Sequence, residues 1–251
     1  MEFGQRQTDH LGIPVLKFKN QNERTVKKIR NIFNCKFWDF CDTLFLFIFT
    51  ERLLRFLAGT AFVLLAFVLL VGLLARYFVR FDGWLIYRKE IGIVAFVFAL
   101  AHGVVSFLIP RFNLFSWAAL ANVNLWLGGL ALLILLFLTV ISGNWAIQKF
   151  GGQKWWFFQQ WGARLALILV LYHVFLMKYG GWADWFIHGG SKTLARPYLP
   201  PLSLFSFLPA IFVVVVRLGE FFGPKIGKVI FFASLSLLAA AYLISFLWWL
   251  V

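Results

Sequence analysis

The sequence predicts an all-α, polytopic membrane helix bundle with six clear transmembrane helices and a short N-terminal helix. Of its 251 residues, 62% are hydrophobic, and the mean hydropathy is +0.83. A soluble domain of this length cannot bury that much apolar surface. Apolar runs long enough to cross a bilayer recur along the chain, and Gly-Gly, Gly-Pro and Pro-Pro pairs fall between them, as turns require.

The N-terminal part is polar and then ambiguous. Residues 1–36 carry eight of the 24 Lys and Arg, and we expect them to form a basic cytoplasmic tail. In residues 37–52, the apolar run 44–49 is too short to span, and Asp39 and Asp42 interrupt its start. An amphipathic helix at the interface and a short first span are both compatible with this segment.

The rest of the chain, within a single transmembrane domain predicted over 37–251, contains the clear spans. The fifth of these is short and carries Pro209, which predicts a kink. The predicted spans are 53–77, 91–110, 122–143, 160–178, 202–218 and 229–250.

The distribution of positive charge predicts the topology. If residues 37–50 cross the membrane, 18 of the 24 Lys and Arg share one side, whereas otherwise the split is 10 against 14. The positive-inside rule therefore favours a crossing, although the residue content of the segment argues against it. With either choice, we expect loops 78–90 and 144–159 to face the cytoplasm and the aromatic loop 179–201 to lie outside, with its tryptophans among lipid headgroups.

Two histidines lie in the middle of predicted spans. His102 falls in 91–110 and His173 in 160–178, with no charged residue close to either. Each lies 13 residues beyond a polar residue at the same boundary, which is roughly 20 Å along a helix, so the two rings are expected at one depth. An ionisable group at membrane depth is costly and usually functional. Two imidazoles without ionic partners most simply indicate a shared metal, and haem iron is the first candidate.

Small residues share a helix face with each histidine. Tight packing between helices also selects small residues, so two interpretations remain open: close packing, or a slot for a flat macrocycle. The residues concerned are Gly92, Ala95 and Ala99 with His102, and Gly162, Ala166 and Leu169 with His173.

Other chemistry is not indicated. Cys35 and Cys41 fit neither CxxC nor CxxCH, which argues against covalent c-type haem and zinc. The sequence has no dinucleotide-binding, P-loop or hydrolytic motif, and no nucleic-acid-binding module despite its charge of +14. We expect His188 to be a surface residue, and His10 lies in the tail.

The order of several segments between residues 58 and 178 resembles a known family. YRKEIGIVAFVFALAH ends at His102, GGLALLILLFLTVISGNW and KFGGQKWW follow, and QQWGARLALILVLYH ends at His173. This order is similar to the ferric reductase-like transmembrane domain family, and within it to the haem b membrane subunits of bacterial periplasmic methionine-sulfoxide reductase systems.

The resemblance implies a site. His102 and His173 match ligand positions for haem b on their helices. Many relatives carry a further histidine where this chain has Gln160, and a second inner ligand would fall near Arg88, so one haem is expected. Arg88 and Arg164 are expected to contact a cofactor, alongside other basic residues at the same boundary (Arg76, Lys89 and Lys154), through haem propionates, a flavin phosphate or lipid headgroups.

The function implied is electron transfer across the bacterial inner membrane, in an oxidoreductase membrane subunit. A cytoplasmic flavin reductase or the quinol pool would donate, with FMN or a quinone approaching from loop 78–90 or 144–159, and an extracytoplasmic redox partner would accept. The sequence shows no FAD- or NADPH-binding segment, so we expect a separate reductant. The alternative is a non-redox transporter or assembly factor with structural histidines. The near absence of charge at mid-span counts against an ion pathway.

Overall fold

The computed structural model describes residues 52–108, 116–190 and 199–247. The predictions for the tail and for residues 37–50 lie outside this part of the chain. The helices in chain order are the first span (Arg52–Tyr77), η1 (Val79–Tyr87), α2 (Arg88–Leu108), α3 (Trp117–Leu120), α4 (Val123–Val140), α5 (Asn144–Phe150), α6 (Gly152–His188), α7 (Leu202–Gly219), η3 (Glu220–Phe222) and α8 (Pro224–Leu247).

Six helical segments in the described part are long and apolar enough to cross a membrane. They are the first span, η1 with α2, α4, α6, α7 with η3, and α8. Each corresponds to one of the predicted spans, so the predicted all-α polytopic membrane bundle is confirmed. The chain is a multi-pass membrane protein.

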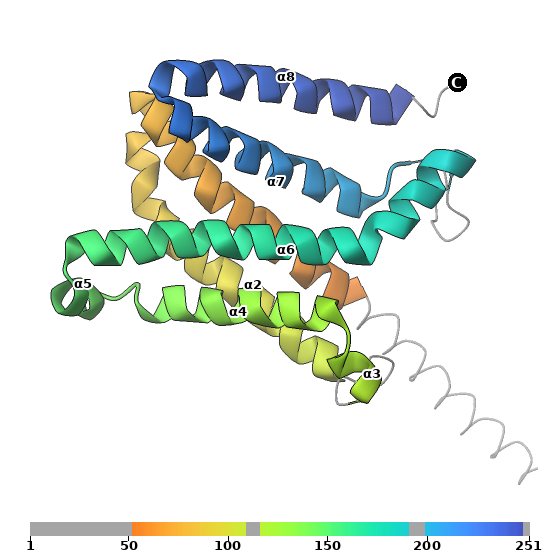
Figure 1. Ribbon diagram of the computed structural model, residues 1–251, viewed down its shortest axis with the longest axis horizontal. Coiled ribbons are helices and arrows are strands. Elements are labelled where there is room, and N and C mark those ends of the chain that lie inside the picture. Colours follow the sequence, from red (N-terminus) through yellow and green to blue (C-terminus); the bar gives the residue numbers. More distant parts are fainter. Residues whose placement is uncertain (1–51, 109–115, 191–198, 248–251) are drawn as a thin grey trace, which may run out of the picture. The chain divides into compact units, whose positions relative to one another are not determined.

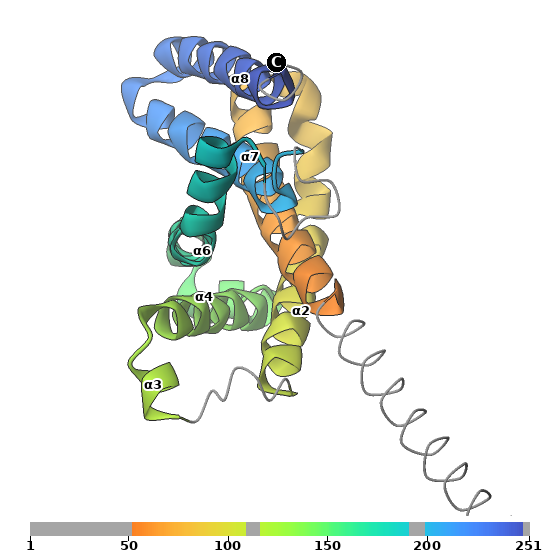
Figure 2. The ribbon, with the colours of Figure 1, turned by 90° about the vertical axis from the view of Figure 1, so that its right-hand side faces the viewer.

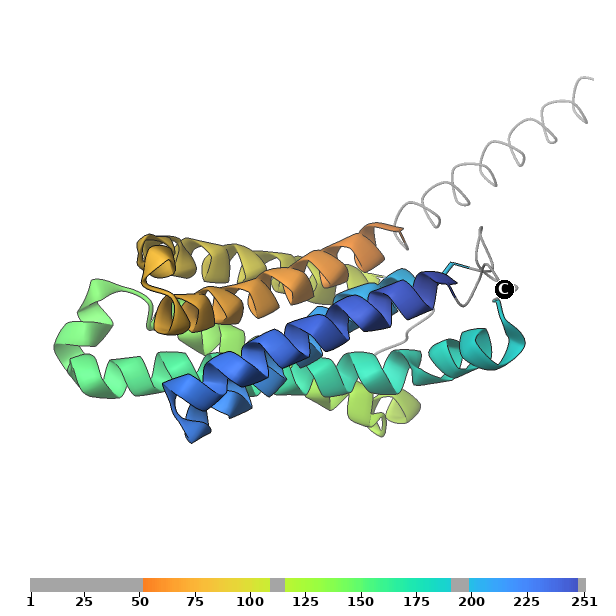
Figure 3. The same ribbon diagram turned by 90° about the horizontal axis from the view of Figure 1, so that it is seen from above.

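Helix α6 connects several helices of the bundle. It packs against α4, α5 and α7, while α2 packs on α4 and α8 packs on α7 (Figure 1). The first span and α2 run beside each other, as two perpendicular views show, and Phe56 of the first span meets Phe98 of α2 edge-to-face at 6.3 Å (Figures 2 and 3). One end of the bundle, on the left in Figure 1, gathers η1, α5, the start of α6 and the connection from α7 to α8.

The first span supplies much of the buried core. Leu69, Val71 and Leu73 are almost completely buried, and Leu69 and Leu73 belong to a cluster that includes Leu167 of α6 and Val216 of α7. Helix α8 buries few side chains, and many of its large apolar residues are exposed. An exposed apolar surface on a membrane-spanning helix is the surface that lipid covers.

Two segments that the sequence predicts to be loops are largely helical, so this prediction is wrong. Residues 144–159 form α5 and the first turns of α6, and α6 continues through residues 179–188 to end at Gly189 in the left-handed conformation (φ 62°). The Gly180-Gly181 pair, which the sequence predicts to be a turn, lies inside α6.

The two tryptophans of this segment are buried, which contradicts their expected place among headgroups. Trp182 donates a hydrogen bond from Nε1 to Ser203 Oγ at 2.9 Å, and its ring lies 4.7 Å from that of Phe207 on α7. Trp185 is buried as well. The end of α6 is therefore fixed by packing on α7, because each large ring finds an intramolecular partner.

Candidate functional site

The two mid-span histidines, the histidine pair, are each held by a backbone carbonyl. His102 Nδ1 lies 3.3 Å from the carbonyl oxygen of Leu54, and His173 Nδ1 lies 2.8 Å from that of Asn124. A carbonyl oxygen only accepts, so Nδ1 is the donor in each bond. The neutral ring then keeps its free lone pair on Nε2. Metal-binding histidines are commonly oriented by such a bond on the other ring nitrogen.

The histidine pair brings together residues 71 positions apart in the sequence. His102 comes from α2 and His173 from α6, both rings are half-buried, and they lie close enough to interact electrostatically. The described segments contain no group of three or more His, Cys, Asp or Glu that could hold a metal ion. Two imidazoles, each with a free lone pair on Nε2, are a donor set that fits a metal needing only two protein ligands, as iron in a macrocycle does.

Helix α4 forms one wall beside His173. A Cβ at Gly128 would lie 3.2 Å from His173 Cε1, so the ring rests directly on the helix backbone. Asn124, whose carbonyl holds the ring, has a buried side-chain Oδ1 with no hydrogen-bond partner in the described structure. A buried oxygen without a partner is uncommon, and here it marks a polar position next to the ring.

The small residues near the histidines have two different surroundings. On α6, a Cβ at Gly162 would lie 2.7 Å from Leu138 of α4, and Ala166 is completely buried, so close packing accounts for these residues. On α2, Ala95 is completely buried, whereas a Cβ at Gly92 would meet nothing within 4 Å. Close packing therefore explains the small residues of α6, but it does not explain Gly92 at the start of α2.

A second group of polar residues lies nearer the end that carries η1 and α5. The carboxylate of Glu220 accepts from Arg164 Nη2 at 2.6 Å and from Arg217 Nη1 at 2.7 Å, and Arg76 approaches it at 3.5 Å. The side chains of Arg217 and Glu220 are only 8% and 5% exposed. Arg217 also donates to the carbonyl of Leu69 at 2.5 Å. We call Arg76, Arg88, Arg164 and Arg217, with Glu220, the arginine cluster.

Arg88 belongs to the arginine cluster without an ion pair of its own. It lies within electrostatic reach of Glu220, Arg164 and Arg217, but within the described segments it makes no salt bridge or hydrogen bond through its side chain. Its guanidinium and that of Arg217 both reach Gly72, where a Cβ would lie 3.3 Å from Arg88 Nη1 and 2.8 Å from Arg217 Nη2. Because Gly72 has no side chain, both guanidinium groups have space beside it.

The histidine pair and the arginine cluster are separate sites. Arg88 and His102 are 14 residues apart on α2, or roughly 21 Å along its axis. Arg164 and His173 are nine residues apart on α6, or roughly 13 Å. The predicted pairing of Arg88 with the histidines in one cofactor site would need a group that spans this distance.

The remaining predicted positions lie outside both sites. Lys89 and Lys154 are exposed, and His188 is exposed at the end of α6, where its Nδ1 lies 2.9 Å from Asp184. Sequence reasoning missed the cluster roles of Arg217 and Glu220. The sequence signal was that Glu220 follows Arg217 by three positions at the end of a span, which puts both on one helix face.

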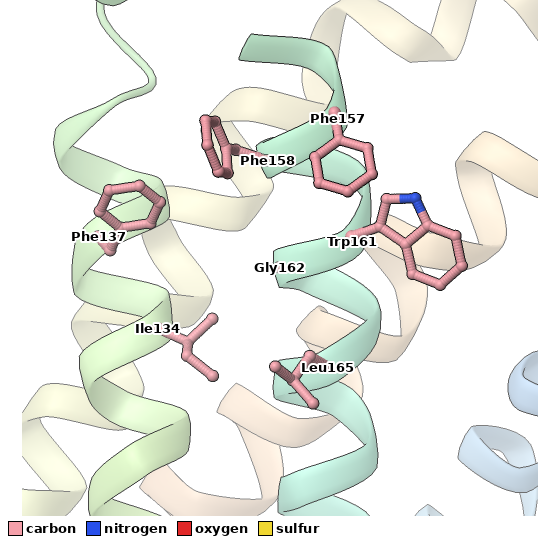
Figure 4. Close-up of a pocket in the computed structure, with 7 residues that line it drawn as sticks. All are labelled: Ile134, Phe137, Phe157, Phe158, Trp161, Gly162 and Leu165. Carbon is pink, nitrogen blue, oxygen red and sulfur yellow. The ribbon is translucent and has the colours of Figure 1, made fainter. Parts of the chain in front are cut away.

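An open apolar groove runs between α4 and α6, with a volume of about 380 Å³ (Figure 4). Trp161 borders it, and the guanidinium of Arg164 lies 4.8 Å from the centre of the same ring. The groove therefore adjoins the arginine cluster through one side chain. Its lining residues are Ile134, Phe137, Phe157, Phe158, Trp161, Gly162 and Leu165.

Comparison with known proteins gives one family. Residues 57–159 match the model of the family described as ferric reductase like transmembrane component. The match covers less than half of the chain; it includes Arg88 and His102 and ends before Arg164 and His173. No curated protein matches the chain. The family match suggests electron transfer at a membrane.

Proposed function

We propose that this protein is a transmembrane b-type haem protein that relays electrons, with His102 and His173 as the two side chains that would hold one haem. The observation that carries the proposal is the geometry of the histidine pair. Two rings from two helices, each with Nδ1 on a carbonyl oxygen, lie within electrostatic reach of each other in apolar spans of the bundle. The family match, which includes His102, supports the same function.

The chain's own residues would hold and insulate this group. Haem supplies a one-electron carrier when bound. The carbonyls of Leu54 and Asn124 fix the two imidazoles, and Gly128 lets α4 approach the His173 ring. Apolar side chains of α2, α4 and α6 belong to the hydrophobic core of the bundle, and an apolar surrounding limits the access of water to such a site.

One haem is proposed because the chain offers one histidine pair in its spans. Gln160 and Arg88 occupy the positions where relatives with two haems are expected to carry further ligands. An amide is a poor iron ligand and a guanidinium stays protonated, so neither replaces an imidazole. The donor would be a cytoplasmic flavin reductase or the quinol pool, and the acceptor an extracytoplasmic partner, as in methionine-sulfoxide repair or metal reduction.

The test is spectroscopic. We expect purified protein to show a reduced-minus-oxidised spectrum of b-type haem and about one haem per chain by the pyridine haemochrome assay. His102→Ala and His173→Ala should each abolish haem binding, whereas the exposed His188→Ala is the matched control and should keep it. Wild-type protein without haem would favour the non-redox alternative, a transporter or assembly factor. Equal haem loss from the His188 variant would refute the pairing.

The direction of electron flow depends on topology, and α6 offers a sharp test of it. Gln153 lies in its first turn and His188 at its last residue, both exposed, and their separation of 35 residues exceeds the thickness of a bilayer. In a background without Cys35 and Cys41, an impermeant thiol reagent on intact cells should label a cysteine at position 188 and spare one at 153. The reverse labelling would invert the proposed direction.

A further inference from the structure

We propose that the arginine cluster is a binding site for a phosphate group, distinct from the histidine pair. The starting observation is its charge. Four guanidinium groups converge on one carboxylate, which leaves three positive charges without a counterion in the described structure. Arg217 and Glu220 are more than nine-tenths buried and the Arg164 side chain is 14% exposed, so bulk water screens their charges poorly, whereas the half-exposed Arg76 is better solvated. Uncompensated charge in such a place is costly unless an anion accompanies it.

The unused donors show where the anion belongs. Glu220 takes one Nη of Arg164 and one of Arg217, and the Nε atoms of both arginines are buried without a partner. Arg88 has a half-buried side chain and makes no ion pair with any described residue, yet it faces both other guanidinium groups. Three arginines within electrostatic reach of one another thus have N–H groups that the described residues leave unused. A single group with several anionic oxygens would satisfy them together.

Phosphate suits these donors better than a second carboxylate does. It carries up to two negative charges and three terminal oxygens, and guanidinium forks bind such oxygens in pairs. A monoanionic carboxylate would leave two of the three surplus charges uncompensated. The half-exposed Arg76, at 50% side-chain exposure, forms the outer side of the cluster. Two sources present the same chemistry, namely the headgroup of an anionic phospholipid and a soluble phosphate.

The proposal does not rest on haem binding. The cluster lies roughly 13 to 21 Å from the histidines along their helices, so its occupancy can be measured in protein with or without haem. Haem content, measured in the same samples, keeps the two proposals apart: loss of haem with unchanged phosphate binding would contradict only the haem proposal.

The test uses the full chain and two variants with the same charge change. Arg88→Gln removes the arginine that has no ion pair, and Lys89→Gln, one residue along α2 and exposed, is the control. Without phosphate, we expect Arg88→Gln to melt at the same or a higher temperature than Lys89→Gln, because a like-charge contact is removed. Inorganic phosphate in detergent should stabilise wild type and Lys89→Gln, relative to sodium chloride of equal ionic strength, and its affinity for Arg88→Gln should fall at least about tenfold.

A second arm identifies the source. Stabilisation by inorganic phosphate supports a soluble ligand. Stabilisation only in nanodiscs of phosphatidylglycerol, and not of phosphatidylcholine, supports a lipid headgroup, provided that Arg88→Gln again loses it. The proposal is overturned if neither phosphate nor phosphatidylglycerol stabilises the wild type, or if the two variants respond alike. A lower melting temperature of Arg88→Gln in delipidated protein without phosphate would also overturn it, since that result would mean that Arg88 already has a partner within the chain.

Discussion

The histidine pair and the arginine cluster lie at two depths of one bundle and differ in charge and in the partners that their side chains need. The histidine pair carries no formal charge when neutral, and each of its rings needs only one carbonyl oxygen to be held. The arginine cluster concentrates four positive charges on one carboxylate. A neutral polar group inside a membrane bundle is satisfied by backbone, whereas a charged group requires other charges. The first site is therefore complete in local hydrogen bonds and the second is not.

This difference predicts where a substitution damages folding and where it damages function. Removal of a histidine leaves a small gap and a carbonyl, so the bundle should survive without its metal site. Removal of Glu220 leaves buried cations with nothing between them, so the bundle itself should weaken.

The largest effect is expected from Glu220→Gln. The substitution removes the only acid that the described structure places within the arginine cluster, and breaking a buried pair in this way costs about 3–5 kcal/mol. The free energy of unfolding, measured by titration with sodium dodecyl sulfate, should fall by that amount. Glu90→Gln, which removes an exposed acid from the first turn of α2, is the control and should change it little. Indistinguishable variants would show that Glu220 does not hold the arginines.

A smaller effect is expected from Gly128→Ala, because it disturbs only the wall of the histidine pair. The new methyl group would lie 3.2 Å from the His173 ring, which must shift by a few tenths of an ångström. Such overpacking costs about 1–3 kcal/mol. Haem content should fall with it, as measured by the haemochrome assay.

The neighbouring glycine is the control for this substitution. A Cβ at Gly129 meets nothing within 4 Å, so Gly129→Ala should keep its haem and stabilise α4 slightly through helix propensity. If both alanine variants retained haem equally, the His173 ring would not rest on α4 in the functional state.

The same comparison explains which features the sequence predicted. His102 and His173 stand out because each is a histidine in a long apolar run, so both helices could be predicted from sequence, while the haem site on them stays a prediction. Arg217 and Glu220 lie at the end of a span, where basic and acidic residues are common, and their spacing of three positions indicates a shared helix face but not that the pair is buried. Only the packing of α7 against the first span reveals it.

The ends of α6 were harder to predict than its middle for a related reason. Hydropathy detects the apolar centre of a helix, and residues 152–159 and 179–188 are too polar or too glycine-rich to register. Both nevertheless continue the helix, because α5 packs on its start and α7 on its end. Tertiary contacts thus extended a helix past the Gly180-Gly181 pair that local sequence marks as a turn.

Tyr77→Phe tests whether a further buried polar group near the arginine cluster lacks a hydrogen-bond partner. We expect a smaller change in the free energy of unfolding than for Glu220→Gln, and of opposite sign. The hydroxyl of Tyr77 is buried without a hydrogen-bond partner in the described structure and presses against Gly227. Removing an unsatisfied buried hydroxyl relieves its desolvation, so we expect stability to stay equal or rise by about 1 kcal/mol. Tyr242→Phe is the control, because its hydroxyl donates to the carbonyl of Phe205 at 2.6 Å and its loss should destabilise. A destabilised Tyr77 variant would mean that this hydroxyl has a bound partner.

The smallest effect is expected from Arg76→Gln. This substitution tests whether the exposure of a side chain, rather than its charge, determines how much an arginine of the cluster contributes to stability. Arg76 contributes the same charge as Arg217, but its side chain is half exposed and lies 3.5 Å from Glu220, against 2.7 Å for Arg217. Water screens an exposed pair, and such pairs contribute about 0–1 kcal/mol. The free energy of unfolding should therefore fall by less than about 1 kcal/mol, and high salt should remove the difference from wild type. Glu220→Gln, measured in the same salt series, should keep most of its deficit because its partners are buried. A loss from Arg76→Gln as large and as salt-resistant as that from Glu220→Gln would place Arg76 among the buried members of the cluster, and the charged site would then extend to the surface of the bundle.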